Sequence, residues 1–314
     1  MITLVTGANG FVGWALCNRL CKDGFFLRRA TRAITTLPNE TTAIEIASIS
    51  SETDWSAGLK SVQQVVHLAA RVHEMNEISS NALTDFRRVN VEGTANLARQ
   101  AAAAGVRRFV FLSSIKVNGE FTEMGQPFTA DSLPTPQDPY GVSKHEAEQL
   151  LNEIATETGM EVVIIRPPLV YGPGVKANFE SMMRWLSRGI PLPLAAIKNN
   201  RRSLVALDNL VDLIVTCLNH PAAANQTFLV SDGEDLSTAD LMKRICEAWG
   251  RRANLYYVPP ELLKLGAAVF RKHAIYQRLC GSLQVDISKT SHLLGWTPPV
   301  SVDEGLRRAA KGIF

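Results

Sequence analysis

The first thirteen residues restrict the fold of this chain more than any other segment does. A short apolar run, Ile2–Val5, leads into three glycines, and a helical apolar pattern then covers Val12–Lys22. Gly7 permits a tight turn, Gly10 lets the backbone approach a pyrophosphate, and Gly13 lets the helix pack close to the strand. The helix N-terminus also offers unbonded N–H groups. The segment therefore predicts the strand–turn–helix unit of a dinucleotide-binding fold, with a glycine loop that binds nothing as the alternative.

Strands and helices alternate through the first half of the chain. This alternation predicts an α/β fold built on a mostly parallel, doubly wound sheet. Ligands of such sheets bind beyond the carboxyl ends of the strands. The expected strands are Ile2–Val5, Phe26–Ala30, Ala43–Ile46, Val65–Leu68, Phe109–Leu112 and Val162–Ile165, and the expected helices are Val12–Lys22, Leu83–Ala104 and Lys144–Thr156.

The alternation ends near residue 172, and the chain beyond it is expected to form a smaller α/β substrate lobe. The predicted division is a dinucleotide-binding domain over residues 1–172 and a lobe mainly over residues 173–314. Segments near 204–232 are expected to return to the first domain. Within them, Leu204–Leu207 and Thr227–Val230 should join the main sheet as strands.

The apolar segment Leu262–Phe270, which Arg271, Lys272 and His273 follow, fits two kinds of helix. One is a helix buried in the lobe, and the other is an interfacial helix that lies on a membrane surface. We favour the buried helix. No apolar stretch reaches the ~20 residues that are needed to span a bilayer, so we expect no membrane span.

The composition excludes several classes of function. A net charge of +3, with 20% charged and 46% apolar residues, is typical of a globular protein and does not favour nucleic-acid binding. The histidines lack metal-ligand spacing and the cysteines form no CxxC pair, so we expect no metal site. The chain opens directly as a buried strand without a signal peptide, which favours the cytoplasm.

Tyr140 and Lys144 form the second informative pattern. Residues four apart on a helix share one face, and Pro139 is typical of a helix entrance. A tyrosine with its ordinary pKa of about 10 is a poor base at neutral pH. A cation about 4 Å away stabilises the phenolate by about 4 kcal/mol at an effective dielectric near 20. We therefore expect Lys144 to lower the pKa of Tyr140 and make it an acid/base, although the spacing alone also fits a surface pair.

The end of the second expected strand favours NADP(H) over NAD(H), with NAD(H) still open. An NAD site usually has an acid there to hold the ribose 2′-hydroxyl, but this chain has Thr31 followed by Arg32. A guanidinium can bind a 2′-phosphate through two hydrogen bonds. We expect Arg32 to do so, with help from Arg28 or Arg29. The alternative is that these arginines only solvate the end of the strand.

Taken together, the motifs resemble an extended short-chain dehydrogenase/reductase of the nucleotide-sugar branch, which contains epimerases, dehydratases and keto-reductases. The resemblance covers essentially the whole chain and implies a Rossmann-type domain with a nucleotide-sugar lobe. The segments that carry it are Gly7–Gly13, Val65–Ala70, Asn90–Asn96, Phe109–Ser114, Tyr140–Lys144, Arg166–Gly174 and Asp286–Trp296.

The resemblance implies a role for each matching side chain. Ser114 would hydrogen-bond the substrate oxygen whose carbon gains or loses hydride, Tyr140 would transfer the proton, and Lys144 would hold the nicotinamide ribose. The residues implied at the cofactor are Gly7, Gly10, Phe11, Val12, Gly13, Arg32, Ser48, Ile49, Leu68, Ala69, Ala70, Tyr140, Lys144 and Pro167. Those implied at the substrate are Ser114, Lys116 and Tyr140, with Asn178 and Arg202 at its diphosphate.

Departures from the family pattern reduce the number of reactions that the chain could catalyse. Relatives often place an Asp that holds the adenine where this chain has Ser48. The sugar dehydratases carry an Asp–Glu pair after the catalytic hydroxyl, and water elimination needs that acid and base. Here the two positions are Ile115 and Lys116, so we exclude dehydration.

Three functional hypotheses follow. The leading one is NADPH-dependent reduction of the C4 ketone of a UDP-linked 6-deoxy-N-acetylhexosamine for surface-polysaccharide biosynthesis. Ser113–Gly119 and Arg201–Ser203 resemble the bacterial 4-reductases that form UDP-quinovosamine. The alternative in the same fold is a UDP-hexose 4-epimerase. A non-catalytic NADP-binding regulator is the remote third, because it would not need Ser114, Tyr140 and Lys144 together.

A homodimer is also expected. Members of the family pair the two long helices, Leu83–Ala104 and Lys144–Thr156, about a two-fold axis. Both expected helices carry apolar residues beyond one core stripe, namely Ala95, Ala98, Ala102, Leu150 and Ile154.

Overall fold

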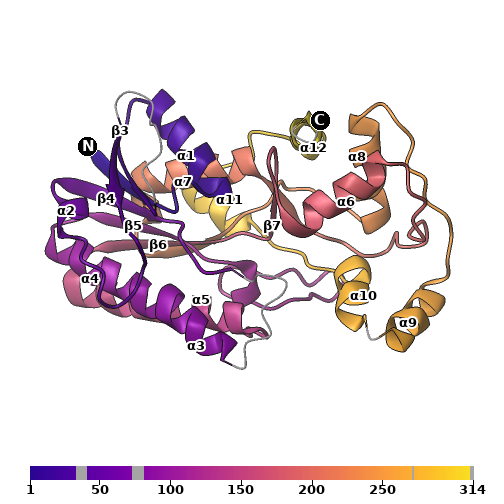
Figure 1. Cartoon of the computed structure of the whole chain (residues 1–314), viewed down its shortest axis with the longest axis horizontal. Helices are drawn as coiled ribbons and strands as arrows, with labels where there is room; N and C mark the ends of the chain where they lie inside the picture. Colours follow the sequence, from indigo (N-terminus) through magenta and orange to yellow (C-terminus); the bar gives the residue numbers. More distant parts are fainter. Residues whose placement is uncertain (33–40, 73–80, 271, 312–314) are drawn as a thin grey trace.

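The computed structural model describes residues 1–32, 41–72, 81–270 and 272–311 (Figure 1). The strands are β1 (Ile2–Thr6), β2 (Phe26–Thr31), β3 (Thr41–Glu45), β4 (Val62–His67), β5 (Arg108–Leu112), β6 (Glu161–Arg166), β7 (Leu169–Tyr171), β8 (Leu204–Ala206) and β9 (Gln226–Leu229). The α-helices are α1 (Phe11–Lys22), α2 (Ser56–Leu59), α3 (Ala82–Phe86), α4 (Thr94–Ala103), α5 (Pro139–Thr158), α6 (Ala177–Ser187), α7 (Leu207–Asn219), α8 (Thr238–Ala248), α9 (Pro260–Val269), α10 (His273–Cys280), α11 (Ser288–Leu294) and α12 (Val302–Lys311). Shorter segments are the π-helix η1 (Arg87–Gly93) and the 3-10 turns η2 (Ile115–Val117) and η3 (Pro221–Ala223).

Seven strands form one sheet in the order β3-β2-β1-β4-β5-β6-β9, and the neighbouring strands pair in parallel. The chain builds outward from β1 to β3 on one side and from β4 to β9 on the other. The strand order therefore reverses between β1 and β4, and ligands of open α/β sheets bind at such a switch point. The doubly wound α/β fold predicted from the sequence is confirmed.

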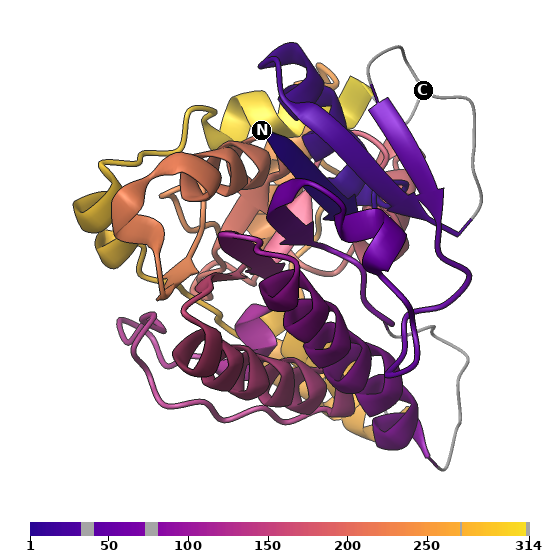
Figure 2. The same ribbon diagram turned by 90° about the vertical axis from the view of Figure 1, so that its left-hand side faces the viewer.

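Helices cover both faces of the sheet, with α1 and α7 on one side and α4 and α5 on the other (Figures 1 and 2). Successive strand residues point to opposite faces, so Val5 and Val66 enter the first core while Leu4 and Val65 enter the second. Burial on both faces explains why these strands are continuous apolar runs in the sequence.

The two strands expected beyond the first half of the chain join different sheets. Thr227–Val230 returns to the main sheet as β9 beside β6, as expected. The expectation for Leu204–Leu207 was wrong, because β8 pairs with β7 in a separate two-stranded sheet. Pro167 and Pro168 have no N–H to donate, so the chain leaves the main sheet after β6 and its next strand finds β8 as a partner.

Helix α5 begins earlier than the predicted Lys144–Thr156. The carboxylate of Asp138 caps its N-terminus and accepts a hydrogen bond from the Gly141 amide at 2.7 Å. At the other end Gly159 takes a φ of 73°, a left-handed conformation that ends the helix. The earlier start places Tyr140 in the first turn of α5.

The expected single helix Leu83–Ala104 is divided into α3, the π-helix η1 and α4. The backbone of η1 packs closely on the segment after β3, since a Cβ on Gly93 would lie 2.6 Å from Ile49 Cγ2. Only a residue without a side chain fits at this contact. The break in helical regularity therefore coincides with a close approach of two backbones.

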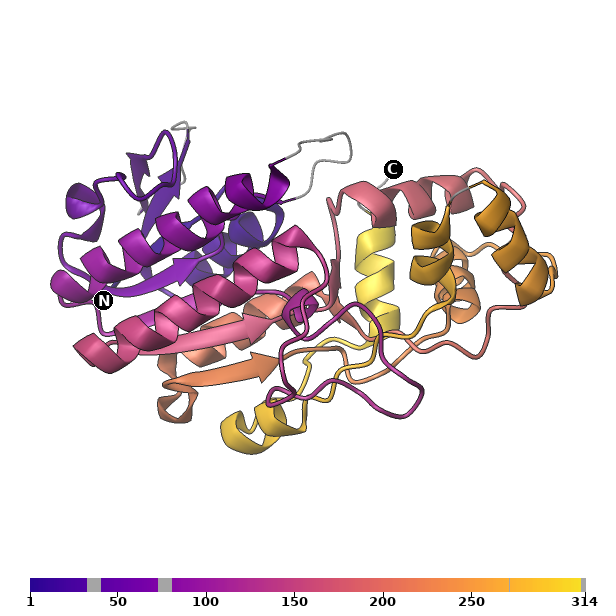
Figure 3. The same cartoon turned by 90° about the horizontal axis from the view of Figure 1, so that it is seen from below.

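The smaller lobe, which is expected to hold the substrate, lies at the far end of the molecule from α2 and α4 (Figures 1 and 3). Helices α6, α8 and α12 enclose a third core that includes Met183, Ile245 and Leu306. The buried carboxylate of Asp232 connects the lobe to the dinucleotide half, because it accepts hydrogen bonds from Tyr171 and Asn209, both at 2.7 Å.

Helix α9 covers the segment for which a buried helix was expected, and this prediction was wrong. None of its residues is buried, and the side chains of Leu262, Leu265 and Val269 are 57%, 61% and 69% exposed. Leu263 packs partly against the lobe core. Across the described ranges, no helix is both long and apolar enough to cross a membrane.

The residues offered in support of a dimer are mostly part of the chain's own core. Ala95, Ala98 and Ile154 are buried between α4, α5 and the sheet, and Leu150 and Ala102 pack partly against them. The apolar residues that lie beyond one core stripe in the sequence therefore pack inside a single chain. The homodimer stays a prediction that rests on the family pattern.

Candidate active site at the carboxyl ends of the strands

The glycine turn after β1 is packed so closely that side chains at Gly7 and Gly13 would clash with neighbouring backbone. Gly7 has a φ of +66°, and its carbonyl accepts a hydrogen bond from the Gly10 amide at 2.8 Å. A Cβ on Gly13 would lie 2.1 Å from that same carbonyl oxygen. No side chain caps the N-terminus of α1. The turn and the helix end thus form a cradle of backbone that suits a dinucleotide pyrophosphate.

The end of β4 forms the opposite wall of this cradle. A Cβ on Gly7 would lie 2.9 Å from the Ala69 amide nitrogen, and that amide donates to Thr6 Oγ1 at 3.3 Å. Buried His67 bridges Thr6 Oγ1 at 2.7 Å and Thr94 Oγ1 at 3.0 Å. Burial lowers the pKa of His67 to about 3, with a contribution from the Lys144 charge, so the ring is neutral and fixes the two walls together.

The three arginines expected at the cofactor phosphate have different surroundings at β2. Thr31 is buried, and Arg32 is exposed. Arg29, two residues earlier and so on the same side of the strand as Thr31, is buried, and its Nη2 donates to Asn9 Oδ1 of the glycine turn at 3.4 Å. The Arg29 side chain also interacts with the Cys17 thiol of α1, so it is directed into the protein. Arg28 is held by backbone carbonyls at the end of α2.

The other implied cofactor residues follow the same edge of the sheet. Ser48 is exposed after β3, and its carbonyl accepts from Thr53 Oγ1 at 3.0 Å. Pro167 is buried after β6, and its carbonyl accepts from the Ile115 amide at 3.0 Å. Half-buried positions on this edge are Phe11 and Val12 on α1, Ile49 after β3, and Leu68, Ala69 and Ala70 after β4.

The two serines after β5 have different partners. Ser113 is buried, and its hydroxyl donates a short hydrogen bond to Glu148. Ser114 is half-buried, and its hydroxyl accepts from the Lys116 amide at 3.2 Å as the cap of η2. Ser113 is therefore committed to the interior. Ser114 retains a hydroxyl hydrogen for a substrate oxygen, as the resemblance implied.

Lys144 is buried one turn after Tyr140 but does not reach its hydroxyl. The Lys144 ammonium donates to the Leu112 carbonyl at 2.9 Å and lies 4.4 Å from the Phe111 ring centroid. It is 6.0 Å from the Tyr140 ring centroid. Burial lowers the pKa of Lys144 to about 7, while the Glu148 charge acts in the opposite direction. The Lys144 ammonium therefore loses its proton at a lower pH than an ordinary lysine does.

The predicted lowering of the Tyr140 pKa is wrong for this structure. Removal of the phenol from water raises its pKa, and the negative charge of Asp138 raises it further. Lys144 cannot reverse this, because burial weakens its own charge and Leu112 holds its Nζ. The geometric part of the expectation holds, since Tyr140 and Lys144 lie one turn apart on α5 with the Lys144 ammonium 6.0 Å from the Tyr140 ring centroid. The Lys144 ammonium contacts the Phe111 ring, and the Tyr140 ring packs against Phe86.

A buried ion pair behind the site was missed by the sequence analysis. Arg166 of β6 donates through Nε and Nη2 to the two carboxylate oxygens of Glu148, at 3.0 and 2.5 Å. Its Nη1 donates to Asn118 Oδ1 at 3.0 Å. Glu148 lies four residues after Lys144 on α5, a spacing that could have suggested a shared face. The pair links α5 to β6 and, through Ser113, to β5.

Asn90 in the π-helix supports both walls of the site. Its Oδ1 accepts from the Arg71 amide at 2.8 Å, and its Nδ2 donates to the Arg71 carbonyl at 3.1 Å. The same Nδ2 donates to Ser143 Oγ of α5 at 3.1 Å. Asn90 therefore connects the chain after β4 to the helix that carries Tyr140 and Lys144.

Lys116 is held by acidic neighbours. Its ammonium forms a short ion pair with Asp138 and lies 3.4 Å from Glu120 Oε1. Its carbonyl packs against the first turn of α5, since a Cβ on Gly141 would lie 2.8 Å from the Lys116 oxygen. Lys116 could contact a substrate only if its ion pair with Asp138 were broken. The implied role of Lys116 stays a prediction.

Arg202 in the lobe is a partly buried cation with carbonyl partners. Its Nη1 donates to the carbonyls of Arg278 at 3.0 Å and Gly281 at 3.2 Å. Burial lowers its pKa, and no ion pair in the described part involves it. Asn178, the second residue implied at the diphosphate, has a side chain outside the described residues.

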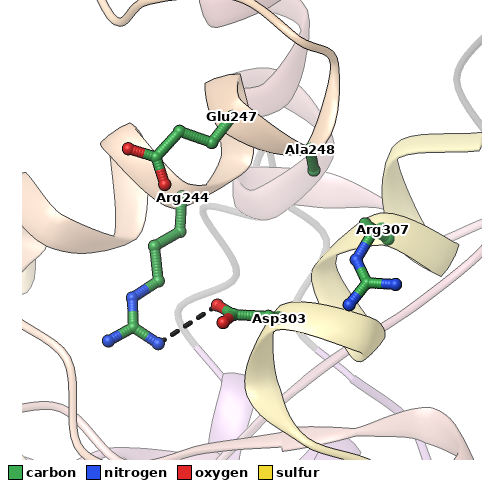
Figure 4. Close-up of a pocket in the computed structure, with 5 residues that line it drawn as sticks. All are labelled: Arg244, Glu247, Ala248, Asp303 and Arg307. Atoms are coloured by element: carbon green, nitrogen blue, oxygen red, sulfur yellow. Dashed lines mark hydrogen bonds and ion pairs between the residues drawn. The ribbon is translucent and has the colours of Figure 1, made fainter.

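A groove elsewhere in the lobe has a volume of about 270 Å³. Figure 4 shows the side chains along it, which come from α8 and α12 and include Arg244, Glu247, Ala248, Asp303 and Arg307. Arg244 pairs with Asp303 at 3.1 Å, so the groove is a charged surface that contains none of the implied site residues. Within the residues placed by the structure, no cluster of His, Cys, Asp and Glu could hold a metal ion.

Comparison with known proteins connects this geometry to relatives. Residues 3–231 match the family described as the NAD dependent epimerase/dehydratase family. The chain is 48% identical to a UDP-glucose 4-epimerase of Vibrio cholerae over 312 residues, which cover 99% of this chain and 95% of the relative. It is 26% identical over 326 residues, 99% of this chain and 95% of the relative, to an N-acetyl-alpha-D-glucosaminyl-diphospho-ditrans,octacis-undecaprenol 4-epimerase of Escherichia coli O157:H7.

A solved structure supports the fold. The UDP-glucuronic acid 4-epimerase of Bacillus cereus, in complex with UDP-glucuronic acid and NAD, superposes with a TM-score of 0.80 at 23% identity, covering 100% of this chain and 99% of that chain. At this identity the match is evidence for a shared Rossmann-type architecture.

Proposed function

The chain belongs to the NAD-dependent epimerase/dehydratase family, and from that premise we propose that it inverts the C4 hydroxyl of a UDP-linked hexose or N-acetylhexosamine. The observation that carries the proposal is the 48% identity, over almost the whole chain, with a UDP-glucose 4-epimerase. The relatives support the 4-reductase less well, although the sequence motifs favoured it. Dehydration stays excluded, because Ile115 and Lys116 occupy the acid and base positions.

In the proposed reaction the cofactor and the side chains of the protein have separate roles. When bound, the dinucleotide supplies the reversible acceptance of hydride from C4 of the sugar. Tyr140 exchanges the O4 proton, accepting it as a phenolate in the forward half and returning it as a phenol in the reverse half. Because the pKa of Tyr140 is raised in this structure, this role requires that pKa to fall when cofactor and substrate bind. Ser114 donates a hydrogen bond to O4 as that oxygen becomes a ketone. Lys144 holds the first turn of α5 to the end of β5 through the Leu112 carbonyl.

Inversion at C4 requires the ketone to turn its other face toward the cofactor before hydride returns. The lobe must therefore hold the diphosphate and leave the sugar free to rotate. Arg202 suits this task, because its guanidinium is partly buried and, among the described residues, its side-chain hydrogen bonds go to carbonyls rather than to a carboxylate. An anchor at the diphosphate allows the sugar to present either face.

We also propose that the cofactor site prefers NADP(H) to NAD(H). Thr31 replaces the acid that would repel a 2′-phosphate, and exposed Arg32 follows it at the end of β2. Arg32 is then the main phosphate contact, while buried Arg29 supports the glycine turn through Asn9. Calorimetric titration should show tighter binding of NADPH than of NADH, and Arg32→Met should remove the difference.

The test of function compares two incubations. In the first, enzyme is mixed with UDP-glucose or UDP-N-acetylglucosamine without added cofactor, and the C4 epimers are measured by NMR. In the second, it receives a UDP-4-keto-6-deoxy sugar and NADPH. We expect C4 epimers in the first incubation and no stoichiometric loss of NADPH in the second. NADPH consumption matched to the keto sugar, with no epimer in the first, would instead establish the reductase.

The homodimer, the cytoplasmic location and the supply of sugars to a surface polysaccharide stay predictions. The dimer is the easiest of them to examine, because light scattering at micromolar concentration separates one 34.4 kDa chain from a pair. A monomer mass would contradict it.

A further inference from the structure

The outer face of the α9–α10 hairpin differs from the rest of the lobe surface. We name this the α9–α10 surface, and it lies at the edge of the lobe farthest from the sheet (Figures 1 and 3). Its exposed apolar residues are Leu262, Leu265, Val269, Phe270 and Ile275, and its exposed basic residues are Lys264, Lys272 and Arg278.

The apolar residues of α9 form a continuous stripe. Leu262, Leu265 and Val269 follow the i, i+3, i+7 spacing of one helix face, and Phe270 extends it. Leu263 lies off this stripe and packs against the lobe core. Folding therefore uses one side of α9 and leaves the other side in water. Contiguous exposed apolar area of this kind marks an interaction site in a natural protein.

The basic residues of this surface also lack acidic partners. No ion pair found in the described structure uses Lys264, Lys272 or Arg278. Elsewhere in the lobe basic side chains are neutralised, as Arg244 is by Glu234 and Arg308 is by Glu304.

The sequence shows the same imbalance of charge. Residues 251–280 contain six Lys and Arg but one acid, Glu261. The whole chain has 33 basic and 30 acidic residues, so the remainder has 27 basic against 29 acidic. The positive charge of the protein is thus concentrated on the segment that exposes the apolar stripe.

We propose that the α9–α10 surface docks on an anionic lipid bilayer. The stripe of leucine, valine and phenylalanine suits the boundary between headgroups and acyl chains, and the flanking cations suit anionic headgroups. A nucleic acid would satisfy the charges but not the apolar stripe. A second copy of the chain in two-fold contact would bring like charges together. A bilayer satisfies both properties of the surface.

Docking would also orient the proposed substrate pocket, a consequence that rests on the proposed function. Arg202 donates to the carbonyls of Arg278 and Gly281 at the end of α10. The cation expected at the substrate diphosphate is therefore attached to the helix that contacts the membrane.

The test is sedimentation with vesicles of phosphatidylcholine alone and of phosphatidylcholine mixed with phosphatidylglycerol. The full chain should sediment with the anionic vesicles and remain in solution with the neutral ones, and added salt should release it. Three triple variants are compared: Leu262→Gln/Leu265→Gln/Val269→Gln, Lys264→Gln/Lys272→Gln/Arg278→Gln, and the control Lys22→Gln/Lys60→Gln/Lys198→Gln, which removes the same charge from exposed positions elsewhere.

We expect the two surface variants to bind anionic vesicles at least tenfold more weakly and the control to stay within twofold of the parent. Thermal unfolding shows whether each variant is folded, and Leu265→Gln alone replaces the apolar triple if that triple is not. Failure of the parent to sediment overturns the proposal, as does equal weakening in the control. A parent dimer that the apolar variant converts to monomer also overturns it, as does DNA binding without vesicle binding. Each readout is independent of turnover, so a failed epimerase assay leaves this result intact.

Discussion

Helix α5 turns polar side chains into the protein, whereas helix α9 turns apolar side chains out of it. On α5, Ser143, Lys144 and Glu148 are buried, and each has a hydrogen-bond partner on another part of the chain. On α9, no residue is buried, and Leu262 and Leu265 face water. A buried polar group is costly unless it is paired, so α5 depends on its neighbours in detail. The outer face of α9 has no such dependence and is free to serve another surface.

The largest effect should come from the ion pair behind α5. Arg166→Met leaves the Glu148 carboxylate buried without its cation, and removing one partner of such a pair costs about 3–5 kcal/mol of the free energy of unfolding. Urea denaturation measures it. The matched change Arg184→Met breaks the exposed pair with Glu180 on α6 and should cost less than about 1 kcal/mol. If both variants lost the same free energy of unfolding, the buried pair would be no more important for stability than the exposed pair.

Tyr140→Phe should leave folding intact and lower turnover of the proposed 4-epimerase by at least about 10²-fold, because it removes only the acid/base hydroxyl. The initial rate of epimer formation and the thermal midpoint are measured together. Tyr257→Phe, at an exposed lobe position, should change neither. A Tyr140→Phe rate within a few-fold of the parent would remove the residue from the mechanism.

The buried amine should make stability depend on pH. The pKa of Lys144 is lowered from 10.5 to about 7 in the folded state, so above pH 7 the unfolded chain binds the extra proton. Stability of the parent should therefore rise by about 2 kcal/mol relative to Lys144→Met between pH 7 and about pH 9. Urea denaturation across that range measures the difference. A difference that does not change with pH would mean that the Lys144 pKa is not lowered by folding.

The smallest effect should come from the outer face of α9. Leu265→Gln replaces an exposed side chain and should change the free energy of unfolding by less than about 0.5 kcal/mol. Leu151→Gln, at a fully buried position on α5, should cost several times more, because it buries an unpaired amide. If Leu265→Gln proved as costly as Leu151→Gln, α9 would have a structural role that its exposure does not indicate.

The parts of the fold that depend on local chemistry could be predicted from the sequence. Gly7 is required by its own positive φ and Gly13 by its contact with the carbonyl of Gly7, and the apolar strands follow from burial on both faces of the sheet. The Glu148–Arg166 pair joins residues 18 apart on different elements, and no local pattern predicts it.

The predictions for α9 and for the Tyr140 pKa were wrong for the same reason, since both depend on contacts between distant parts of the chain. The exposure of α9 could not be predicted, because an apolar segment has the same composition whether a core or another surface covers it. The spacing of Tyr140 and Lys144 predicted their shared face correctly. The direction in which the Lys144 ammonium points depends on the Leu112 carbonyl, and only the folded chain shows that.

The π-helix η1 makes the length of its segment matter more than the identity of most of its residues. In a π-helix each hydrogen bond spans five residues, so η1 contains a residue that an α-helix would not need. Deleting one residue between Arg87 and Gly93 would restore the ordinary helical period and rotate one flank by about 100° relative to the other. Asn90 would then leave Arg71 and Ser143, or α4 would turn away from the sheet. Substitutions of exposed residues in η1 should therefore be tolerated, whereas insertions or deletions should disrupt the structure.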